Sequence, residues 1–120
     1  MTKPASFGDY VRGCREKRAA TDRAFSVRQV AKRIGIEPSY LSKIERGNQS
    51  PPGEETIRNL AQELGQDGDM LLAMAGKVSS DLLDVIRARP MLFADLLRQL
   101  KTLPDKAVLH LVREVRDGEW

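Results

Sequence analysis

The sequence predicts an all-α fold, in which a domain of five helices is followed by about three further helices. Apolar residues recur at intervals of three and four along nearly the whole chain, which is the spacing of helices with one buried face. The alternation with a period of two that indicates β-strands is missing. Glycine and proline residues divide the helical pattern into short segments, and they favour two domains, over residues 1–76 and 77–120.

The composition is that of a soluble globular protein. Of the 120 residues, 41% are hydrophobic and 31% are charged, and no apolar run approaches the roughly 18 residues of a membrane-spanning helix. The N-terminus carries no signal-peptide pattern, and the single cysteine excludes an intrachain disulfide, so we expect a cytoplasmic protein. One cysteine and one histidine, far apart in sequence, are too few for a structural zinc site, and no cofactor is expected.

The first predicted helix covers about residues 6–18. Phe7, Val11 and Cys14 recur on it at helical spacing, so these three side chains are expected to face the core. We interpret Cys14 as a small buried hydrophobic residue, and a redox-sensing thiol is the alternative.

Two short helices joined by a tight turn follow. Ser26 is a good N-cap for the second helix, which ends at Gly35, a residue that readily adopts the positive φ found at helix C-termini. Pro38 fits the first turn of a third helix, where its missing N–H costs nothing, and Gly47 ends that helix. Two short helices with a glycine in the connecting turn are typical of a helix-turn-helix motif. Helices this short are marginal in isolation, so the third helix requires a reason beyond its own propensity.

The later helices are also bounded by glycine and proline. A fourth ends at Gly65 and a fifth at Gly76, whereas Pro90 and Pro104 each open a helix in the C-terminal segment. Apolar residues at helical spacing mark the fourth and fifth helices: Ile57, Leu60, Ala61 and Leu64, then Met70, Leu71, Leu72 and Met74. The three C-terminal helices are expected at about residues 80–88, 90–101 and 104–117.

The third helix carries a face that has no structural role. At about 100° per residue, Leu41 and Ile44 project to one side of this helix. The opposite side is polar, small and cationic, and it consists of Ser39, Ser42, Lys43 and Arg46. Hydroxyl groups and a lysine can meet base edges in a major groove, and an arginine can contact a phosphate. We therefore predict that this helix binds double-stranded DNA.

The distribution of charge agrees with a polyanionic partner. Residues 1–60 hold 12 Lys or Arg against 7 Asp or Glu, whereas residues 61–120 hold 8 against 10. A basic half is the expected footprint of nucleic-acid binding. The alternative is that a small surface reaches this balance by chance.

The residues of the motif resemble those of a known family. The stretch SVRQVAKRIGIEPSYLSKIERG, residues 26–47, is similar to the helix-turn-helix of the phage-repressor-like (Cro/C1, or XRE) transcriptional regulators. PPGEETIRNLAQELG resembles the fourth helix of that family, and the likeness extends over about residues 7–76. The resemblance implies a five-helix domain that binds operator DNA as a dimer. The matching positions are Ala31, Gly35, Ile36, Leu41, Ile44, Glu45, Arg46 and Gly47.

Arg15 and Glu45 are predicted to form an ion pair inside this domain. On the helical projections, Glu45 falls near Leu41 and Arg15 falls near Val11, so both charged groups point to the apolar side. Burying either charge alone is costly, and a pair between the first and third helices avoids that cost. Arg18 is the competing partner, and the alternative is that one or both side chains reach solvent.

The chain departs from the family pattern in two places. The link RAATDRAF between the first two helices is longer than the short turn of the family, and Arg23 on it is interpreted as a solvated loop charge rather than a contact with the DNA backbone. Val27 stands where the family often has glutamine, so Arg28 or Gln29 would supply the phosphate contact there.

The predicted DNA-binding residues divide by role. Base readout is assigned to Ser39, Ser42 and Lys43, with Glu37 and Pro38 at the start of the helix. Phosphate contacts are assigned to Arg28 or Gln29, and to Tyr40, Arg46, Asn48 and Gln49. An aromatic ring at the edge of the core is the alternative for Tyr40. Serine discriminates weakly between bases, so the operator sequence does not follow from these residues.

The C-terminal segment carries two apolar stripes, and His110 projects away from the second, as a solvated residue rather than a ligand. A segment of about 40 residues rarely buries such a surface alone. We therefore expect it to dimerise with its copy in a second subunit, and the alternative is that it packs on the fourth and fifth helices. The first stripe is Leu92, Phe93, Leu96, Leu97, Leu100 and Leu103, and the second is Val108, Leu111, Val112 and Val115.

The leading functional hypothesis is a transcriptional regulator of the repressor type, which binds a short palindromic operator as a homodimer. The alternative is an antitoxin that sequesters a partner protein through its C-terminal helices and represses its own operon. A third hypothesis makes the C-terminal segment the target of a regulatory protease or a sensor of a peptide. The sequence shows no nucleophile–base pair, glycine-rich phosphate loop or carboxylate pair, so an enzyme is not expected.

Overall fold

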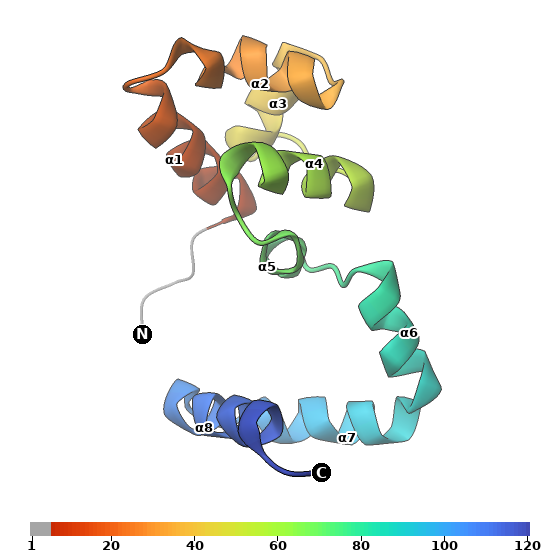
Figure 1. Cartoon of the computed structure of the whole chain (residues 1–120). Coiled ribbons are helices and arrows are strands. Elements are labelled where there is room, and N and C mark those ends of the chain that lie inside the picture. Colours follow the sequence, from red (N-terminus) through yellow and green to blue (C-terminus); the bar gives the residue numbers. More distant parts are fainter. Residues whose placement is uncertain (1–5) are drawn as a thin grey trace. The chain divides into compact units, whose positions relative to one another are not determined.

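The computed structural model describes residues 6–120, which form eight α-helices and one 3₁₀ helix and contain no strand (Figure 1). In chain order these are α1 (Phe7–Ala19), η1 (Arg23–Phe25), α2 (Val27–Ile34), α3 (Pro38–Glu45), α4 (Glu54–Leu64), α5 (Gly68–Met74), α6 (Ser80–Ala88), α7 (Pro90–Leu100) and α8 (Asp105–Asp117). The chain divides between Ser79 and Ser80 into two compact units. Within the described residues, no helix combines the length and apolar content needed to cross a membrane. The all-α class predicted from the sequence is confirmed.

Side-chain caps and glycines set the helix ends of the first unit. Ser6, Ser26 and Asp67 each accept a hydrogen bond from a backbone N–H in the first turn of α1, α2 and α5, respectively. α2 ends at Gly35, whose φ of 77° lies in the left-handed region, and α4 ends in the same way at Gly65 with a φ of 64°. Since these conformations favour glycine, the local sequence determines where both helices stop.

The first unit is organised around one hydrophobic core. α1 packs on α3, α2 packs on both α3 and α4, and α4 packs on α5. Full burial of an aliphatic or aromatic side chain stabilises the fold by about 1.5–3 kcal/mol, so these contacts supply the main driving force for folding. The buried hydrophobic residues are Phe7, Val11, Val30, Ala31, Leu41, Ile44, Ile57, Leu60, Ala61, Leu64, Leu71 and Leu72.

α1 approaches α3 closely at Gly8. A Cβ atom at this position would collide with the backbone carbonyl oxygens of Ile44 and Glu45. The missing side chain therefore allows the start of α1 to lie directly against the end of α3. The helical pattern of the sequence contains no sign of this requirement, because it depends on a contact between distant segments.

Residues 77–79 belong with the first unit, although the sequence places the domain boundary after residue 76. The Nζ atom of Lys77 donates a hydrogen bond to the carbonyl oxygen of Pro52 over 2.9 Å. Ser79 is buried, with 1% of its surface exposed. The hydrogen bond of Lys77 connects the segment after α5 to the loop before α4, and together with the burial of Ser79 it accounts for the later boundary.

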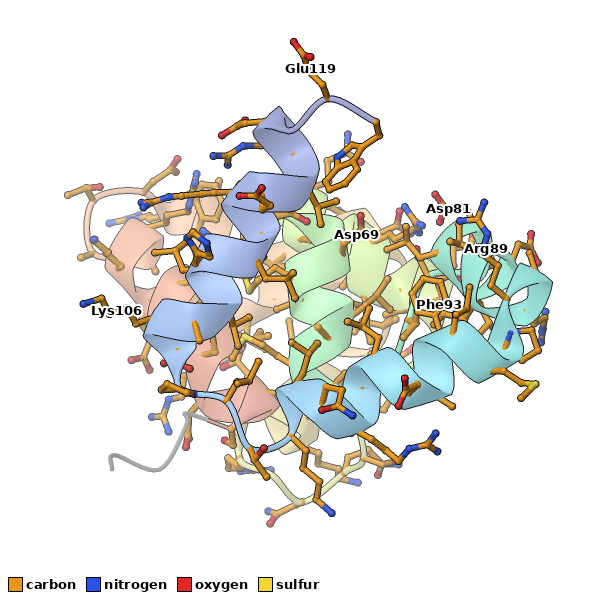
Figure 2. All side chains as sticks on the ribbon, turned by 90° about the horizontal axis from the view of Figure 1, so that it is seen from below. Asp69, Asp81, Arg89, Phe93, Lys106 and Glu119 are labelled. Atoms are coloured by element: carbon orange, nitrogen blue, oxygen red, sulfur yellow. The ribbon has the colours of Figure 1, made fainter. Side chains whose placement is uncertain are left out.

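The second unit is helical, but none of its side chains is buried across residues 80–120. α6 spans its predicted range, α7 ends one residue earlier than predicted and α8 begins one residue later. Figure 2 shows Phe93 projecting from α7 and Lys106 projecting from α8. Large hydrophobic side chains remain exposed on all three helices: Leu82, Val85, Met91, Leu92, Leu96, Leu97, Leu109, Val112 and Val115.

Candidate nucleic-acid interface

α2 and α3 form the predicted helix-turn-helix, with residues 35–37 as the turn. The positive φ of Gly35 ends α2, and Pro38 is the first residue of α3, where no N–H is needed. Leu41 and Ile44 are buried, with 0% and 2% of their surfaces exposed. The opposite face of α3 is therefore turned away from the core.

The residues predicted to contact DNA lie on α3, at the start of α2 and in the loop after α3. None of their side chains makes a hydrogen bond or an ion pair within the part of the chain that the structure describes. Their polar groups are thus available to an external partner. The exposed members are Arg28, Gln29, Glu37, Ser39, Lys43, Arg46, Asn48 and Gln49, and the half-buried members are Pro38, Tyr40 and Ser42.

Tyr40 differs from the rest of this set, because its ring packs against the hydrophobic core. This is the edge-of-core position that the sequence allows as the alternative to a phosphate contact. Ser42 is half-buried as well, whereas Ser39 and Lys43 are exposed. Ser39, Lys43 and Glu37 are therefore the exposed members of the predicted base-reading set.

Arg15 and Glu45, which the helical projections turn toward each other, form a bidentate ion pair between α1 and α3. Arg15 Nε donates to Glu45 Oε2 over 2.7 Å, and Arg15 Nη2 donates to Glu45 Oε1 over 2.9 Å. Only 9% and 3% of the two side chains are exposed. A third hydrogen bond joins Arg15 Nη1 to the carbonyl oxygen of Phe25 over 3.1 Å. The two buried charges thus satisfy each other, and they connect α3 to α1 and to the link before α2.

The long link between α1 and α2 is folded, which the sequence pattern does not predict. Its η1 turn is capped by Asp22, whose carboxylate accepts a hydrogen bond from the N–H of Ala24. The ring of Phe25 lies 5.4 Å from the guanidinium carbon of Arg18 and 5.3 Å from that of Arg33. Arg18, the competing partner for Glu45, therefore contacts an aromatic ring instead. The available sequence signals were an aspartate at a capping distance and a single aromatic residue in a polar link.

A polar hollow of about 270 Å³ opens next to the buried ion pair. Val27 at the start of α2 lines it and has an apolar side chain, whereas Arg28 and Gln29 do not line it. Arg12 Nε donates a hydrogen bond to Glu16 Oε1 over 2.8 Å at its edge. The hydrogen bond and the charge of Arg12 lower the pKa of Glu16. The other polar side chains of the hollow are Arg15 and Glu45, which bind each other, and Ser42 and Arg46 of the predicted DNA-binding set.

Cys14 is half-buried and packs against the core beside Tyr10. The Tyr10 hydroxyl donates a hydrogen bond to Gln66 Oε1 over 2.7 Å, which joins α1 to the loop after α4. Desolvation, followed by the proximity of Cys14, raises the pKa of Tyr10. Cys14 therefore lies at a packing contact, as a small hydrophobic residue would. His110 on α8 is exposed, and residues 6–120 contain no group of three acidic, His or Cys side chains that could hold a metal ion.

Comparison with known proteins identifies the first unit. The family model of the helix-turn-helix domain matches residues 6–74, which is more than half of the chain. A solved structure of a complex between the SinR protein and the SinI protein is similar at 20% identity and a TM-score of 0.46, over 81% of this chain and 99% of that chain. Comparison with curated proteins gives no match. On the match over residues 6–74, this chain belongs to the helix-turn-helix domain family.

Proposed function

We propose that this chain is a transcriptional regulator of the phage-repressor-like (Cro/C1, XRE) type, which represses genes by binding a short palindromic operator as a homodimer. Its helix-turn-helix domain supports DNA-binding transcriptional regulation. It acts in the cytoplasm by binding alone, without catalysis, cofactor or metal. One observation carries the proposal: the outward face of α3 is polar and has no partner in the described chain, while its inward face is held by the core and the Arg15–Glu45 pair.

The proposed reading mechanism uses α3 as a rigid element in the major groove. Ser39 and Lys43 meet base edges there, because both are exposed on the face opposite Leu41 and Ile44. Phosphate contacts come from exposed residues that flank α3, and they fix its register on the duplex. The flanking residues are Arg28, Gln29, Arg46, Asn48 and Gln49.

The second unit supports the dimer in this proposal. α7 and α8 line an apolar groove of about 380 Å³, and none of the side chains in residues 80–120 is buried. A helical segment of this size gains little stability unless its apolar faces are covered. A second copy offers the same faces, and a two-fold axis makes the contact self-complementary. Two copies of α3 would then meet half-sites about 34 Å apart, one helical turn of DNA. The groove is lined by Leu96, Leu100, Val108, Leu111, Val112 and Val115, with Arg116 at its edge.

The DNA-binding proposal is tested by selecting genomic DNA fragments with the purified full chain. We expect a palindromic consensus, which is lost in the double variant Ser39→Ala, Lys43→Ala. The matched control is Thr102→Ala, Lys106→Ala, which removes the same two functional groups from exposed positions of the second unit. Weak, salt-sensitive binding without a consensus, unchanged in the Ser39 and Lys43 variant, would overturn the proposal.

The dimer is tested by the molecular mass in solution at micromolar concentration. We expect twice the mass of the chain, and a single-chain mass for the variant Leu96→Lys, Val112→Lys, whose charges would enter the apolar groove. The selected consensus should shorten to one half-site in that variant. A single-chain mass for the unaltered protein would defeat the dimer.

The same uncovered groove favours one second candidate, an antitoxin that sequesters a partner protein through α7 and α8 and represses its own operon. A partner helix with an apolar face would cover the groove as a second copy does. Co-expression of this chain with the product of the neighbouring gene separates the two candidates. A stable complex that contains one copy of each chain, and that is lost in Leu96→Lys, Val112→Lys, supports the antitoxin and contradicts the homodimer.

A further inference from the structure

The hollow next to the Arg15–Glu45 pair is lined by residues from three elements: α1, α2 and α3. Arg12 comes from α1, Val27 from the start of α2, and Arg46 from the end of α3. Ser42, a member of the base-reading face, lines the same hollow. The hollow is therefore continuous with the surface that α3 presents to DNA, and its hydrogen-bond donors are mainly guanidinium groups.

The charges around the hollow leave one positive charge without a counter-ion. Arg15 and Glu45 neutralise each other in a buried bidentate pair. Arg12 is paired with Glu16 over 2.8 Å. Arg46 is exposed and makes no ion pair in residues 6–120. An anion that entered the hollow would therefore meet a guanidinium that forms no ion pair with any of the described residues.

The pair between Arg12 and Glu16 can be exchanged for a contact with an anion. Its two side chains are 53% and 54% exposed, and the residues lie four apart on one helix. Exposed pairs of this kind contribute little to stability, and a carboxylate that loses its partner there is hydrated by water. Arg12 can thus turn from Glu16 to a phosphate at small cost. Glu16 would in turn repel a phosphate, because Arg12 lowers the pKa of its carboxyl and keeps it ionised.

We propose that this hollow holds one phosphodiester group of the operator backbone, bound jointly by Arg12 and Arg46. The inference rests on the proposed function and adds α1 to the DNA-binding surface. A helix in the major groove, which is about 12 Å wide, lies between the two sugar–phosphate backbones, so residues beside its base-reading face meet phosphates. Two guanidinium groups offer the paired N–H donors that phosphate oxygens accept. The side chain of Val27 is apolar, so the arginines supply the side-chain donors at this place.

The test measures the affinity of the full chain for a fragment from the genomic selection, as a function of salt concentration. Arg12→Gln should weaken binding about three- to tenfold in low salt, the difference between one charge-assisted hydrogen bond and the surface ion pair that it replaces. Arg12→Lys should keep most of the affinity. The matched control is Arg58→Gln on α4, because Arg58 forms the same kind of pair, with Glu54, and is 46% exposed. This control should leave the affinity unchanged.

Two further variants show whether one phosphate is shared. The double variant Arg12→Gln, Arg46→Gln should lower the slope of log affinity against log salt by about 0.9, the value for one phosphate. Two separate phosphates would lower it by about 1.8. Glu16→Gln releases Arg12 and removes a repelling charge, so it should strengthen binding, by up to about fivefold. The thermal midpoint of each variant is measured alongside, to show that the domain remains folded.

The outcomes separate this inference from the proposed function. If the unaltered chain selects no consensus, both fail. If it selects a consensus but Arg12→Gln behaves as Arg58→Gln does, the phosphate site is overturned and the DNA-binding function stands. A slope change of two phosphates in the double variant would overturn the shared site, and stronger binding by Glu16→Gln supports it.

Discussion

The two units of this chain are built from the same kind of helix, but they differ in what the helices bury. In the first unit, α1–α5 enclose twelve buried hydrophobic side chains. In the second unit, α6–α8 bury none, and Met91 and Leu92 are 83% and 70% exposed. Apolar residues recur at helical spacing in both units. An amphipathic helix therefore creates an apolar face, but that face is buried only where other helices pack on it.

The number of neighbouring helices explains the difference. In the first unit, α2 packs on both α3 and α4, and α4 also packs on α5, so most apolar faces meet another face. In the second unit, three helices within residues 80–120 have too little interior for this. The first unit can thus hold α3 rigidly, whereas in the proposed dimer the second unit gains stability when a second copy covers α7 and α8. Four substitution experiments test this comparison, from the largest expected effect to the smallest.

The largest effect is expected from breaking the ion pair inside the first unit. Arg15→Ala leaves Glu45 buried without its partner, which should lower the free energy of unfolding by about 3–5 kcal/mol. Arg12→Ala, on the same helix but at an exposed ion pair, should change stability little. Denaturant unfolding of both variants measures the difference. An Arg15→Ala variant that lost DNA affinity but kept full stability would instead make Arg15 a DNA contact.

The next largest effect compares one leucine from each unit. Leu41→Ala should cost about 2–5 kcal/mol, because it removes a fully buried side chain and leaves a cavity. Leu97 is 57% exposed, so Leu97→Ala should cost far less in a dilute sample. If a second copy covers α7, the cost at Leu97 should rise with protein concentration, because association stabilises the folded state. Thermal unfolding at two concentrations measures both effects, and equal costs at Leu41 and Leu97 would contradict the comparison.

A smaller effect, with opposite signs at two sites, is expected from glycines of α1. Gly8→Ala places a Cβ against the carbonyl oxygens of Ile44 and Glu45, and should destabilise the first unit by about 1–3 kcal/mol. In Gly13→Ala the added Cβ meets no described atom within 4 Å beyond its own stretch of helix, and the change should stabilise by about 0.5–1 kcal/mol, because alanine favours helix. Denaturant midpoints measure both changes. Two changes of the same sign would show that the contact at Gly8 does not limit the packing of α1 on α3.

The smallest effect concerns the cap of α2. The Oγ atom of Ser26 accepts a hydrogen bond from the N–H of Gln29 over 3.2 Å. Ser26→Ala removes this acceptor and should destabilise the first unit by about 1 kcal/mol. Ser26→Asp retains an acceptor and serves as the control. If Ser26→Asp destabilised the first unit as much as Ser26→Ala does, the lost capping hydrogen bond would not be the cause.

The candidate interface could be predicted in outline from local residues. The boundaries of α2 and α3 follow from Ser26, Gly35 and Pro38, because capping and backbone preferences act within a few residues. The ion pair between Arg15 and Glu45 could be predicted from two helical projections, because each side chain lies on the apolar side of its helix. The hollow lined by Arg12 and Arg46 could not be found in this way, because its walls come from three elements.

By itself, the sequence determined the all-α class, the helix ends that capping residues, glycine and proline mark, and the polar face of α3 opposite Leu41 and Ile44. Only the tertiary structure decided the close approach of α1 to α3 at Gly8, the contact of the Phe25 ring with two arginines, and the domain boundary at Ser79. The physical reason is the range of the interactions. Periodicity and capping depend on neighbours along the chain, whereas these three features depend on residues that meet only after the helices have packed.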